Sequence, residues 1–166
     1  MNKSAFSLLM FVLSALPTSA DCVEAGAIAP PCELEAFKTN TRLDLAQYRG
    51  KVVYLDFWAS WCGPCAQSMP FMNEMDGQLK KQGLEIIAVN LDESREDADA
   101  FLVRHPVSFT VAATPAGQCP TQFGVMAMPS SYLIDRHGKI RRVQLGFHEA
   151  ERSEIRSAIV ALLAER

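Results

Sequence analysis

The chain has 166 residues, of which 49% are hydrophobic, and this is enough to build one domain around a sizeable core. Its 16 basic and 19 acidic residues give a formal net charge of −3, and the basic residues form no stripe along the chain. Nucleic-acid binding normally needs a basic surface, so we exclude nucleic acid as a partner.

The first twenty residues have the composition of an export signal. Lys3 precedes an apolar run over 5–16, and a small residue, Ala20, ends the segment. A positive start, a short apolar run and a small final residue predict a secretory signal peptide over 1–20, followed by a single domain over 21–166. Its removal takes away one lysine and no acid, which leaves 15 basic and 19 acidic residues and a net charge of −4.

Export decides the redox environment that we expect for this protein. The compact leader favours the bacterial periplasm, where disulfides persist. The apolar run is short for a bilayer span, so an uncleaved membrane anchor is the weaker alternative. Cys22 invites a lipoprotein interpretation, but Asp21 stands before it where a small residue is expected, and we reject lipidation.

Short strands and helices alternate along the first half of the domain. The segments 32–37 and 42–45 predict a strand hairpin, and the apolar run 52–57 predicts a buried strand. A helix follows this strand, and Pro70 inside the helix predicts a bend there. We interpret the methionines of this helix as core residues. Its buried face is predicted by apolar residues at helical spacing, namely Ala66, Met69, Met72, Met75 and Leu79.

The second half continues this alternation. Gly83 ends the helix, and the next strand completes a strand–helix–strand unit with a right-handed crossover and parallel pairing. Asp92 or Ser94 is a suitable cap for the helix after it. The predicted elements are strands over 84–90, 108–112, 131–134 and 139–145, and helices over 92–103, 120–123 and 150–164.

A cysteine pair lies between the 52–57 strand and the helix after it, in the run Trp61-Cys62-Gly63-Pro64-Cys65. A Cys-x-x-Cys pair in that position is typical of a redox dithiol. Unpaired N–H groups and the positive end of the helix dipole stabilise an anion there, so Cys62 is the expected nucleophile. Cys65, one turn later, is placed to attack the mixed disulfide formed at Cys62. Pro64 suits the first turn, since its missing N–H costs nothing there.

Zinc binding and an inert structural disulfide are the alternatives for this motif. A zinc site needs two further ligands at matching spacing. The remaining cysteines and histidines are scattered singly, at Cys22, Cys32, Cys119, His105, His137 and His148. We therefore favour redox chemistry and expect neither a metal nor an organic cofactor beyond the Cys62–Cys65 disulfide itself.

Asp56 interrupts an otherwise apolar strand, where burial of a charged carboxylate costs several kcal/mol. Desolvation should raise its pKa toward neutrality. A carboxyl tuned in this way could take the proton of Cys65 when that thiol reacts. The alternative is that Asp56 is solvated at the strand end or bonded to the backbone.

The segment from Phe57 to Cys65 resembles the active site of the thioredoxin superfamily. Segments over 26–30, 48–53 and 123–129 resemble its exported branch, the TlpA/ResA-like thiol-disulfide oxidoreductases. The likeness covers most of the chain from about Gly26 to Gly146. It implies an α/β thioredoxin fold, with a central mixed β-sheet flanked by helices, an N-terminal β-hairpin, and an extra helix and strand inserted over 92–116.

The resemblance also implies roles for residues around the dithiol. Asp56 takes the place of the buried thioredoxin aspartate that assists proton transfer, and Pro129 takes the place of a cis-proline beside the active-site disulfide. The backbone of Met128 would then pair with an extended client segment. We expect Trp61 to belong to an exposed apolar docking face. The predicted client-binding residues are Trp61, Gly63, Pro64, Met128 and Pro129.

Two positions depart from the exported branch. Its members commonly carry glutamate three residues after the second cysteine, where this chain has Ser68. Many of them also have asparagine at the position of Asp56. Both departures indicate thiol tuning closer to that of thioredoxins.

Three cysteines lie outside the motif, which is an odd number for an exported protein. Cys32 and Cys119 could be small buried hydrophobic residues. They could instead pair with each other, or one of them could pair with Cys22. The sequence does not decide among these arrangements.

We predict a periplasmic protein disulfide reductase that uses Cys62 and Cys65. The Gly63-Pro64 dipeptide resembles that of reducing thioredoxins and disfavours a disulfide-forming oxidant, and the motif lacks the threonine and arginine of a peroxidase. A chaperone, or a Cu(I)-delivery protein with Met69 and Met128 as further ligands, is the alternative from another class.

By resemblance, electrons would come from a membrane thiol-transfer protein. Clients could include apocytochromes c, in cytochrome c maturation, or copper-delivery proteins, and we expect a monomer.

Overall fold

The computed structural model describes residues 23–115 and 117–165. The predicted signal peptide over 1–20 and Cys22 lie outside the described residues, so these interpretations stay predictions. Within the described ranges, none of the helices is long and apolar enough to cross a membrane.

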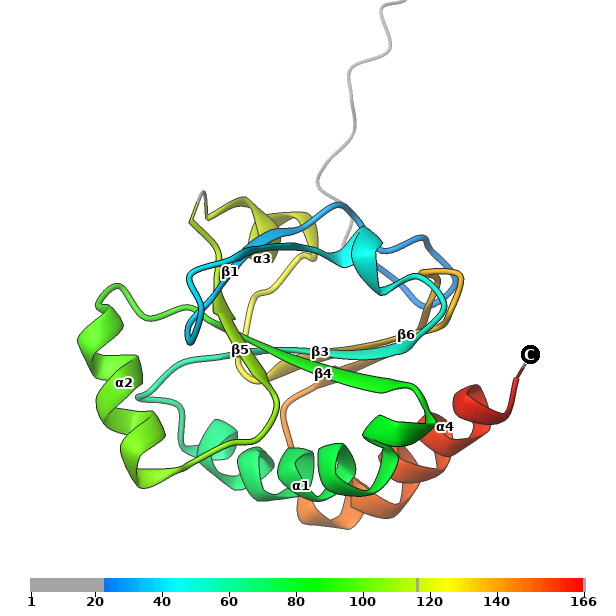
Figure 1. Ribbon diagram of the computed structural model, residues 1–166. Helices are drawn as coiled ribbons and strands as arrows, with labels where there is room; N and C mark the ends of the chain where they lie inside the picture. Colours follow the sequence, from blue (N-terminus) through cyan, green and yellow to red (C-terminus); the bar gives the residue numbers. More distant parts are fainter. Residues whose placement is uncertain (1–22, 116, 166) are drawn as a thin grey trace, which may run out of the picture.

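One mixed sheet organises the described part of the chain (Figure 1). Its strands are β1 (Glu33–Ala36), β2 (Arg42–Asp44), β3 (Val52–Trp58), β4 (Leu84–Asn90), β5 (Thr110–Ala113), β6 (Ser130–Ile134) and β7 (Ile140–Leu145). They lie side by side in the order β2-β1-β5-β4-β3-β6-β7. The strand β3 pairs in parallel with β4 and antiparallel with β6, so the strand that leads to the dithiol is internal.

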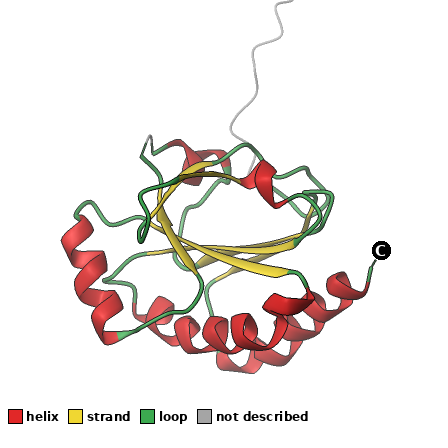
Figure 2. Ribbon diagram, viewed as in Figure 1, coloured by secondary structure: helices red, strands yellow, loops and turns green. Residues whose placement is uncertain are grey.

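Helices cover both faces of this sheet (Figures 1 and 2). On one face lie α1 (Gly63–Leu79) and α4 (Arg152–Ala164), with α2 (Arg95–Arg104) at the end of the same layer. On the other face lies the short α3 (Gln118–Gln122), next to the N-terminal hairpin. Short 3-10 turns complete the connections at η1 (Leu45–Tyr48), η2 (Lys80–Gln82) and η3 (Glu149–Glu151).

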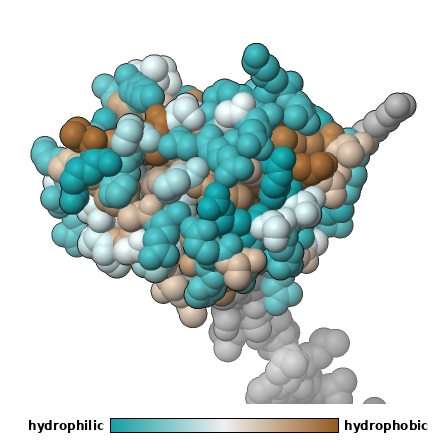
Figure 3. Space-filling model, turned by 90° about the horizontal axis from the view of Figure 1, so that it is seen from below, coloured by the Kyte–Doolittle hydropathy of each residue, from teal (hydrophilic) through white to brown (hydrophobic). Residues whose placement is uncertain are grey.

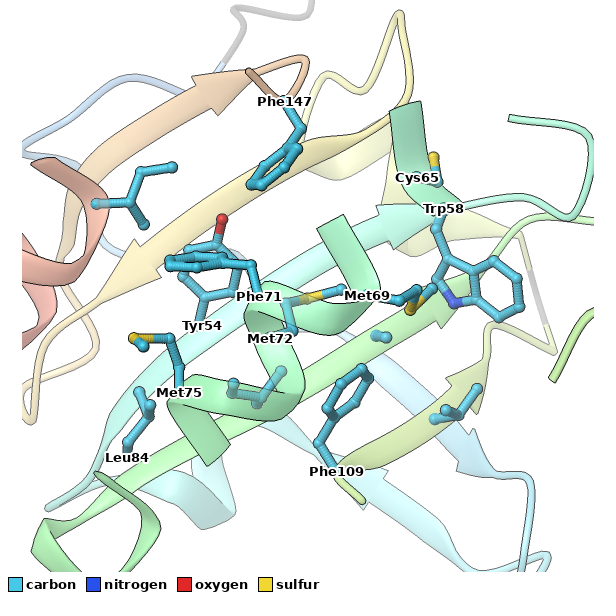
Figure 4. Close-up of a cluster of buried hydrophobic side chains, with 14 of the residues drawn as sticks. Tyr54, Trp58, Cys65, Met69, Phe71, Met72, Met75, Leu84, Phe109 and Phe147 are labelled. Carbon is cyan, nitrogen blue, oxygen red and sulfur yellow. The ribbon is translucent and has the colours of Figure 1, made fainter. Parts of the chain in front are cut away.

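The sheet separates two apolar cores, because successive side chains of β3 point to opposite faces. Tyr54 and Trp58 belong to the core under α1 and α4, whereas Val53 and Leu55 belong to the core under α3. Figure 4 shows the first core, in which side chains of α1 pack over the sheet. The methionines predicted to be core residues are buried there, namely Met69, Met72 and Met75.

The outer surface of the helical layer agrees with amphipathic helices. Seen from the side of α1 and α4, the surface is mainly hydrophilic, with small apolar spots (Figure 3). Helix α4 buries Ile155, Ile159 and Leu162, as its spacing predicted. Helix α1 runs through Pro70 without ending there. Both helices therefore hold their places by packing one apolar face against the sheet.

The thioredoxin-like fold expected from the sequence is confirmed, and each predicted strand and helix is present. The differences lie at the ends of the elements, such as α2, which begins later than the predicted helix over 92–103. The inserted strand β5 pairs in parallel with β4 and antiparallel with β1. The insert therefore joins the N-terminal hairpin to the central sheet.

A disulfide joins Cys32, just before β1, to Cys119 in α3. The sequence did not decide between this pairing, a bond from either residue to Cys22, and two unpaired core thiols. Both residues are 1% exposed and belong to the core cluster that also contains Phe57 and Phe123. The bond spans a sequence separation of 87 residues, and it ties α3 to the start of the hairpin.

Candidate active site

The dithiol lies where β3 gives way to α1. Cys62 is the N-cap residue of α1, and its Sγ accepts a hydrogen bond from the backbone N–H of Cys65 at 3.2 Å. A disulfide joins the two cysteines, so the structure holds the oxidised form. Pro64 lies in the first turn of α1, where its missing N–H costs no helical hydrogen bond. The fold thus places a sulfur atom at the positive end of a helix dipole, as the motif predicted.

The two cysteines differ in their access to the surface. Cys62 is 5% exposed, whereas Cys65 is fully buried. The side chain of Trp61 beside them is 72% exposed. Gly63 and Pro64 are exposed as well. A molecule that approaches the dithiol therefore meets Cys62 before Cys65.

The loop before β6 contains the predicted cis peptide bond, between Met128 and Pro129. Met128 packs against the core cluster that contains both cysteines of the dithiol. Ser130 Oγ donates a hydrogen bond to the carbonyl oxygen of Ala127 at 2.7 Å, which closes this loop onto itself. Met126 is 86% exposed. The loop therefore carries both the cis bond and an exposed apolar side chain.

Asp56 is fully buried within the sheet. Its Oδ1 accepts a hydrogen bond from Ser131 Oγ at 2.5 Å, while its Oδ2 has no hydrogen-bond partner among the described residues. Burial raises the pKa of Asp56 to about 7, and the hydrogen bond from Ser131 opposes this rise. The alternative that Asp56 is solvated or bonded to the backbone is wrong, because the carboxyl is enclosed and its partner is a side chain.

Asp56 faces the helix that carries Cys65. Side chains alternate along β3, so Asp56 points to the same side of the sheet as Tyr54 and Trp58. These two residues belong with Cys65 to one core cluster, and Figure 4 shows all three in it. Burial, followed by the charge of Asp56, raises the pKa of Tyr54. A carboxyl that titrates near neutrality therefore lies on the sheet face covered by the helix of the dithiol.

Asp92 has a different role from the one predicted. Neither predicted cap provides a side-chain capping bond: Ser94 is the N-cap residue of α2 but makes none. The carboxylate of Asp92 instead accepts hydrogen bonds from the backbone N–H and the hydroxyl of Ser60, at 3.0 Å each, and from Asn90 Nδ2 at 2.8 Å. Asp92 thus fixes the short loop that leads from β3 into the dithiol.

Sequence reasoning missed the contacts that Ser131 and Asp92 make in the site. Neither residue belongs to a recognisable motif, and the partners Asp56 of Ser131 and Ser60 of Asp92 are far away in the chain. Ser68, the departure from the exported branch, is buried and donates a hydrogen bond from its hydroxyl to the carbonyl oxygen of Cys65 at 2.9 Å. A serine therefore takes part in the backbone structure of α1 at this position.

The described residues include no group of three His, Cys, Asp or Glu side chains that could hold a metal ion. Met69, a ligand in the Cu(I)-delivery hypothesis, is 1% exposed and packed in the core. Its thioether therefore contributes to packing in this structure.

Residues 24–159 match the family model described as Redoxin. The thiol-disulfide oxidoreductase ResA of Geobacillus thermodenitrificans is 36% identical over 129 residues, which cover 78% of this chain and 74% of that protein. ResA of Bacillus subtilis is 33% identical over 136 residues, which cover 81% of this chain and 75% of that protein.

Solved structures of proteins named for disulfide chemistry are also similar to this chain. A crystal structure from Chlorobium tepidum, assigned as a thiol:disulfide interchange protein DsbE, has a TM-score of 0.81 and 46% sequence identity, and the match covers 86% of this chain and 99% of that chain. A solution structure from Bacteroides thetaiotaomicron, assigned as a protein disulfide isomerase, has a TM-score of 0.78 and 28% sequence identity. The match covers 86% of this chain and 92% of that chain. Both are named for disulfide chemistry.

Proposed function

We propose that this chain, which belongs to the Redoxin family and is a thiol-disulfide oxidoreductase, reduces disulfides in client proteins. One observation carries the proposal. Cys62 lies near the surface at the start of a helix, Cys65 is enclosed behind it, and a buried carboxyl lies on the sheet face below. This arrangement provides an attacking group, a resolving group and a proton acceptor in one place.

The reaction begins at Cys62 of the reduced protein. Its thiolate attacks one sulfur of a client disulfide, so that a bond forms between Cys62 and the client while the client disulfide breaks. The leaving client thiolate takes a proton from solvent. The backbone N–H of Cys65 and the helix dipole favour the anionic sulfur of Cys62 before the attack.

Cys65 completes the exchange. Its thiol transfers a proton to Asp56, and the resulting thiolate attacks Cys62 Sγ. The Cys62–Cys65 bond forms, the bond from Cys62 to the client breaks, and the client sulfur leaves as a thiolate that takes a proton from solvent. Two electrons have then passed from the dithiol to the client. A pKa of about 7 leaves about half of the Asp56 carboxyls ionised at neutral pH, ready to accept this proton.

The client binds across the surface beside Cys62. The exposed indole of Trp61 provides apolar contact area, with the exposed Gly63 and Pro64 beside it. The loop with the cis bond at Pro129 offers the backbone of Met128 to an extended client segment, as a sheet edge recruits a peptide.

We further propose a compartment, an electron donor and a class of clients for this protein. Export by a cleaved signal peptide over 1–20 places the domain in the periplasm, where a membrane thiol-transfer protein returns the dithiol to its reduced form. Apocytochromes c or copper-delivery proteins are the proposed clients. The redox-active disulfide serves without a metal or organic cofactor.

The reduction potential of the Cys62–Cys65 couple tests the direction of electron flow. We expect a value near that of thioredoxin, about −270 mV, when the domain is equilibrated in glutathione or dithiothreitol buffers. A value near −120 mV, typical of a strong periplasmic oxidant, would make the protein a disulfide-forming enzyme and overturn the reductase proposal.

A further inference from the structure

Asp56 has one hydrogen-bond donor at its carboxyl, and that donor comes from a different strand. Ser131 lies directly opposite Asp56 in the antiparallel pairing of β3 with β6, so both side chains emerge on the same face. Ser131 Oγ donates to Oδ1 at 2.5 Å, and Oδ2 is enclosed without a hydrogen-bond partner in the described part of the chain. One carboxyl oxygen is therefore held by Ser131, and the other makes no hydrogen bond to the described residues.

We propose that Ser131 is a positioning residue for the resolving step: its hydroxyl holds Oδ1 of Asp56, which leaves Oδ2 as the oxygen that takes the proton of Cys65. The proposal rests on the proposed role of Asp56 in proton transfer. Ser131 does not touch the reacting sulfur atoms; it acts through the carboxyl.

The place of Ser131 in the chain gives this contact a second consequence. Ser131 follows the cis-proline Pro129 by two residues and is the second residue of β6, which is buried throughout. The strand that presents the client-binding loop therefore also holds the proton acceptor. A shift of this loop would move the hydroxyl relative to Asp56.

Burial is the larger influence on the pKa of Asp56, and Ser131 is the side chain whose hydrogen bond opposes it. Tyr54 is the titratable neighbour on β3 itself, and the neighbour on β4 in the strand register is Ala88. Cys65 is the titratable group of α1 in the same core cluster. A side-chain hydrogen bond with Ser131 lowers the pKa of Tyr54, and the charges of Arg142 on β7 and Glu151 in η3 also act on Tyr54. Desolvation and the bond from Ser131 are the influences that act on Asp56.

A hydrogen bond to an ionised carboxylate is stronger than one to a neutral acid, so the hydroxyl favours the ionised form. Loss of this bond should raise the pKa of Asp56 by about one unit. At neutral pH the ionised fraction would then fall from about one half to about one tenth, and the resolving step would slow about fivefold.

The test uses stopped-flow reaction of the reduced protein with 5,5′-dithiobis(2-nitrobenzoate). Attack by Cys62 releases the first thionitrobenzoate, and attack by Cys65 on the mixed disulfide releases the second. In Ser131→Ala we expect the pH midpoint of the second phase to rise by about one unit, with wild-type rates restored at high pH. In Ser131→Thr, which keeps the hydroxyl, the midpoint should stay near that of the wild type.

Ser130→Ala is the matched control. Ser130 is also buried and also donates through its hydroxyl, but to the carbonyl oxygen of Ala127 in the loop. It lies next to Ser131 and points to the opposite face of the sheet. A midpoint shift of the same size in Ser130→Ala would mean that disturbance of the loop, rather than the bond to Asp56, causes the effect.

A carboxyl-carbon NMR titration of Asp56 gives a direct readout that does not depend on activity. An unchanged Asp56 titration in folded Ser131→Ala would overturn the inference. If Asp56→Asn leaves the pH midpoint of the second phase unchanged, the proposed role of Asp56 itself fails. If Asp56→Asn removes the midpoint while Ser131→Ala leaves it in place, the role of Asp56 stands and the positioning role of Ser131 fails.

Discussion

The two disulfides of this protein differ in the length of chain that they close. The Cys62–Cys65 bond joins residues three positions apart, at the start of one helix, whereas the Cys32–Cys119 bond joins residues 87 positions apart. In a chain-entropy description, a crosslink stabilises the folded state by restricting the unfolded chain, and the effect grows with loop length. The long disulfide can therefore contribute much to stability, and the short one little.

Their surroundings differ in the same direction. Cys32 and Cys119 are enclosed in an apolar core whose other members include Phe57 and Phe123. The Cys62–Cys65 pair lies at the other face of the sheet, with Cys62 near the surface and a titratable carboxyl on the strand below. Because the short bond closes a loop of only a few residues, opening it changes the stability of the fold little, and that bond is suited to repeated reduction. The long bond is suited to holding the fold together.

The largest expected effect comes from removing the short disulfide's attacking sulfur. Cys62→Ser should lower insulin-disulfide reduction by roughly a thousandfold or more, because the other cysteines of the described chain are enclosed in the cores and cannot form the mixed disulfide. Its free energy of unfolding should differ little from that of the reduced wild type. The companion variant Cys65→Ser should accumulate a covalent complex with the client, which would be visible on a non-reducing gel. Reductase activity retained in Cys62→Ser would refute the assignment of Cys62 as the nucleophile.

Removal of the long disulfide should act on stability instead. Replacing both Cys32 and Cys119 by alanine should lower the free energy of unfolding by about 3–5 kcal/mol, measured by urea denaturation of the oxidised protein. The folded fraction should keep its reaction rate with 5,5′-dithiobis(2-nitrobenzoate). A loss of that rate with unchanged stability would reverse the roles that we assign to the two disulfides.

On the sheet face of the dithiol, the buried carboxyl of Asp56 should make the free energy of unfolding depend on pH. The pKa of Asp56 is raised from an ordinary value of 3.8 to about 7, so the folded state favours the protonated acid. Stability from this source is therefore complete below pH 3.8 and is lost as the pH rises toward 7. Relative to the wild type, Asp56→Asn should gain about 1.4 kcal/mol in free energy of unfolding per pH unit across this window, and about 4 kcal/mol at most.

Denaturant titrations of both proteins at several pH values measure this difference. The value near pH 3.8 serves as the reference, because the acid is then neutral in the folded state and the amide replaces it with a similar shape. A stability difference that stays constant from there to pH 8 would mean that Asp56 does not titrate in this range.

The smallest expected effect concerns the surface beside the short disulfide. Trp61→Ala removes an indole that is 72% exposed, so the fold should lose little stability. Its KM for a protein disulfide should rise by about fivefold, equivalent to about 1 kcal/mol of client contact. The reaction with a small aromatic disulfide should change less. An equal loss with both substrates would instead indicate that Trp61 shapes the dithiol itself.

The sequence by itself determined the features that depend on neighbouring residues. A continuous apolar run identified β3, and helical spacing of apolar residues identified the buried face of α1. The short spacing of Cys62 and Cys65 at a strand-to-helix boundary identified the redox motif. The cis bond at Pro129 was predictable from the family resemblance, and the isolated carboxyl of Asp56 from its apolar strand. Apart from the cis bond, these inferences need only local structure, because helix termini and strand faces follow from a few adjacent residues.

The tertiary structure alone decided which distant residues meet. The pairing of Cys32 with Cys119, the bond from Ser131 to Asp56 over 75 residues, and the bond from Ser60 to Asp92 over 32 residues all depend on the order and register of strands. A register shift of one residue would turn Ser131 to the other face of the sheet. No local pattern encodes that register, since it results from packing both cores together. The contacts of Ser131 and Asp92 in this site therefore became visible only in the folded chain.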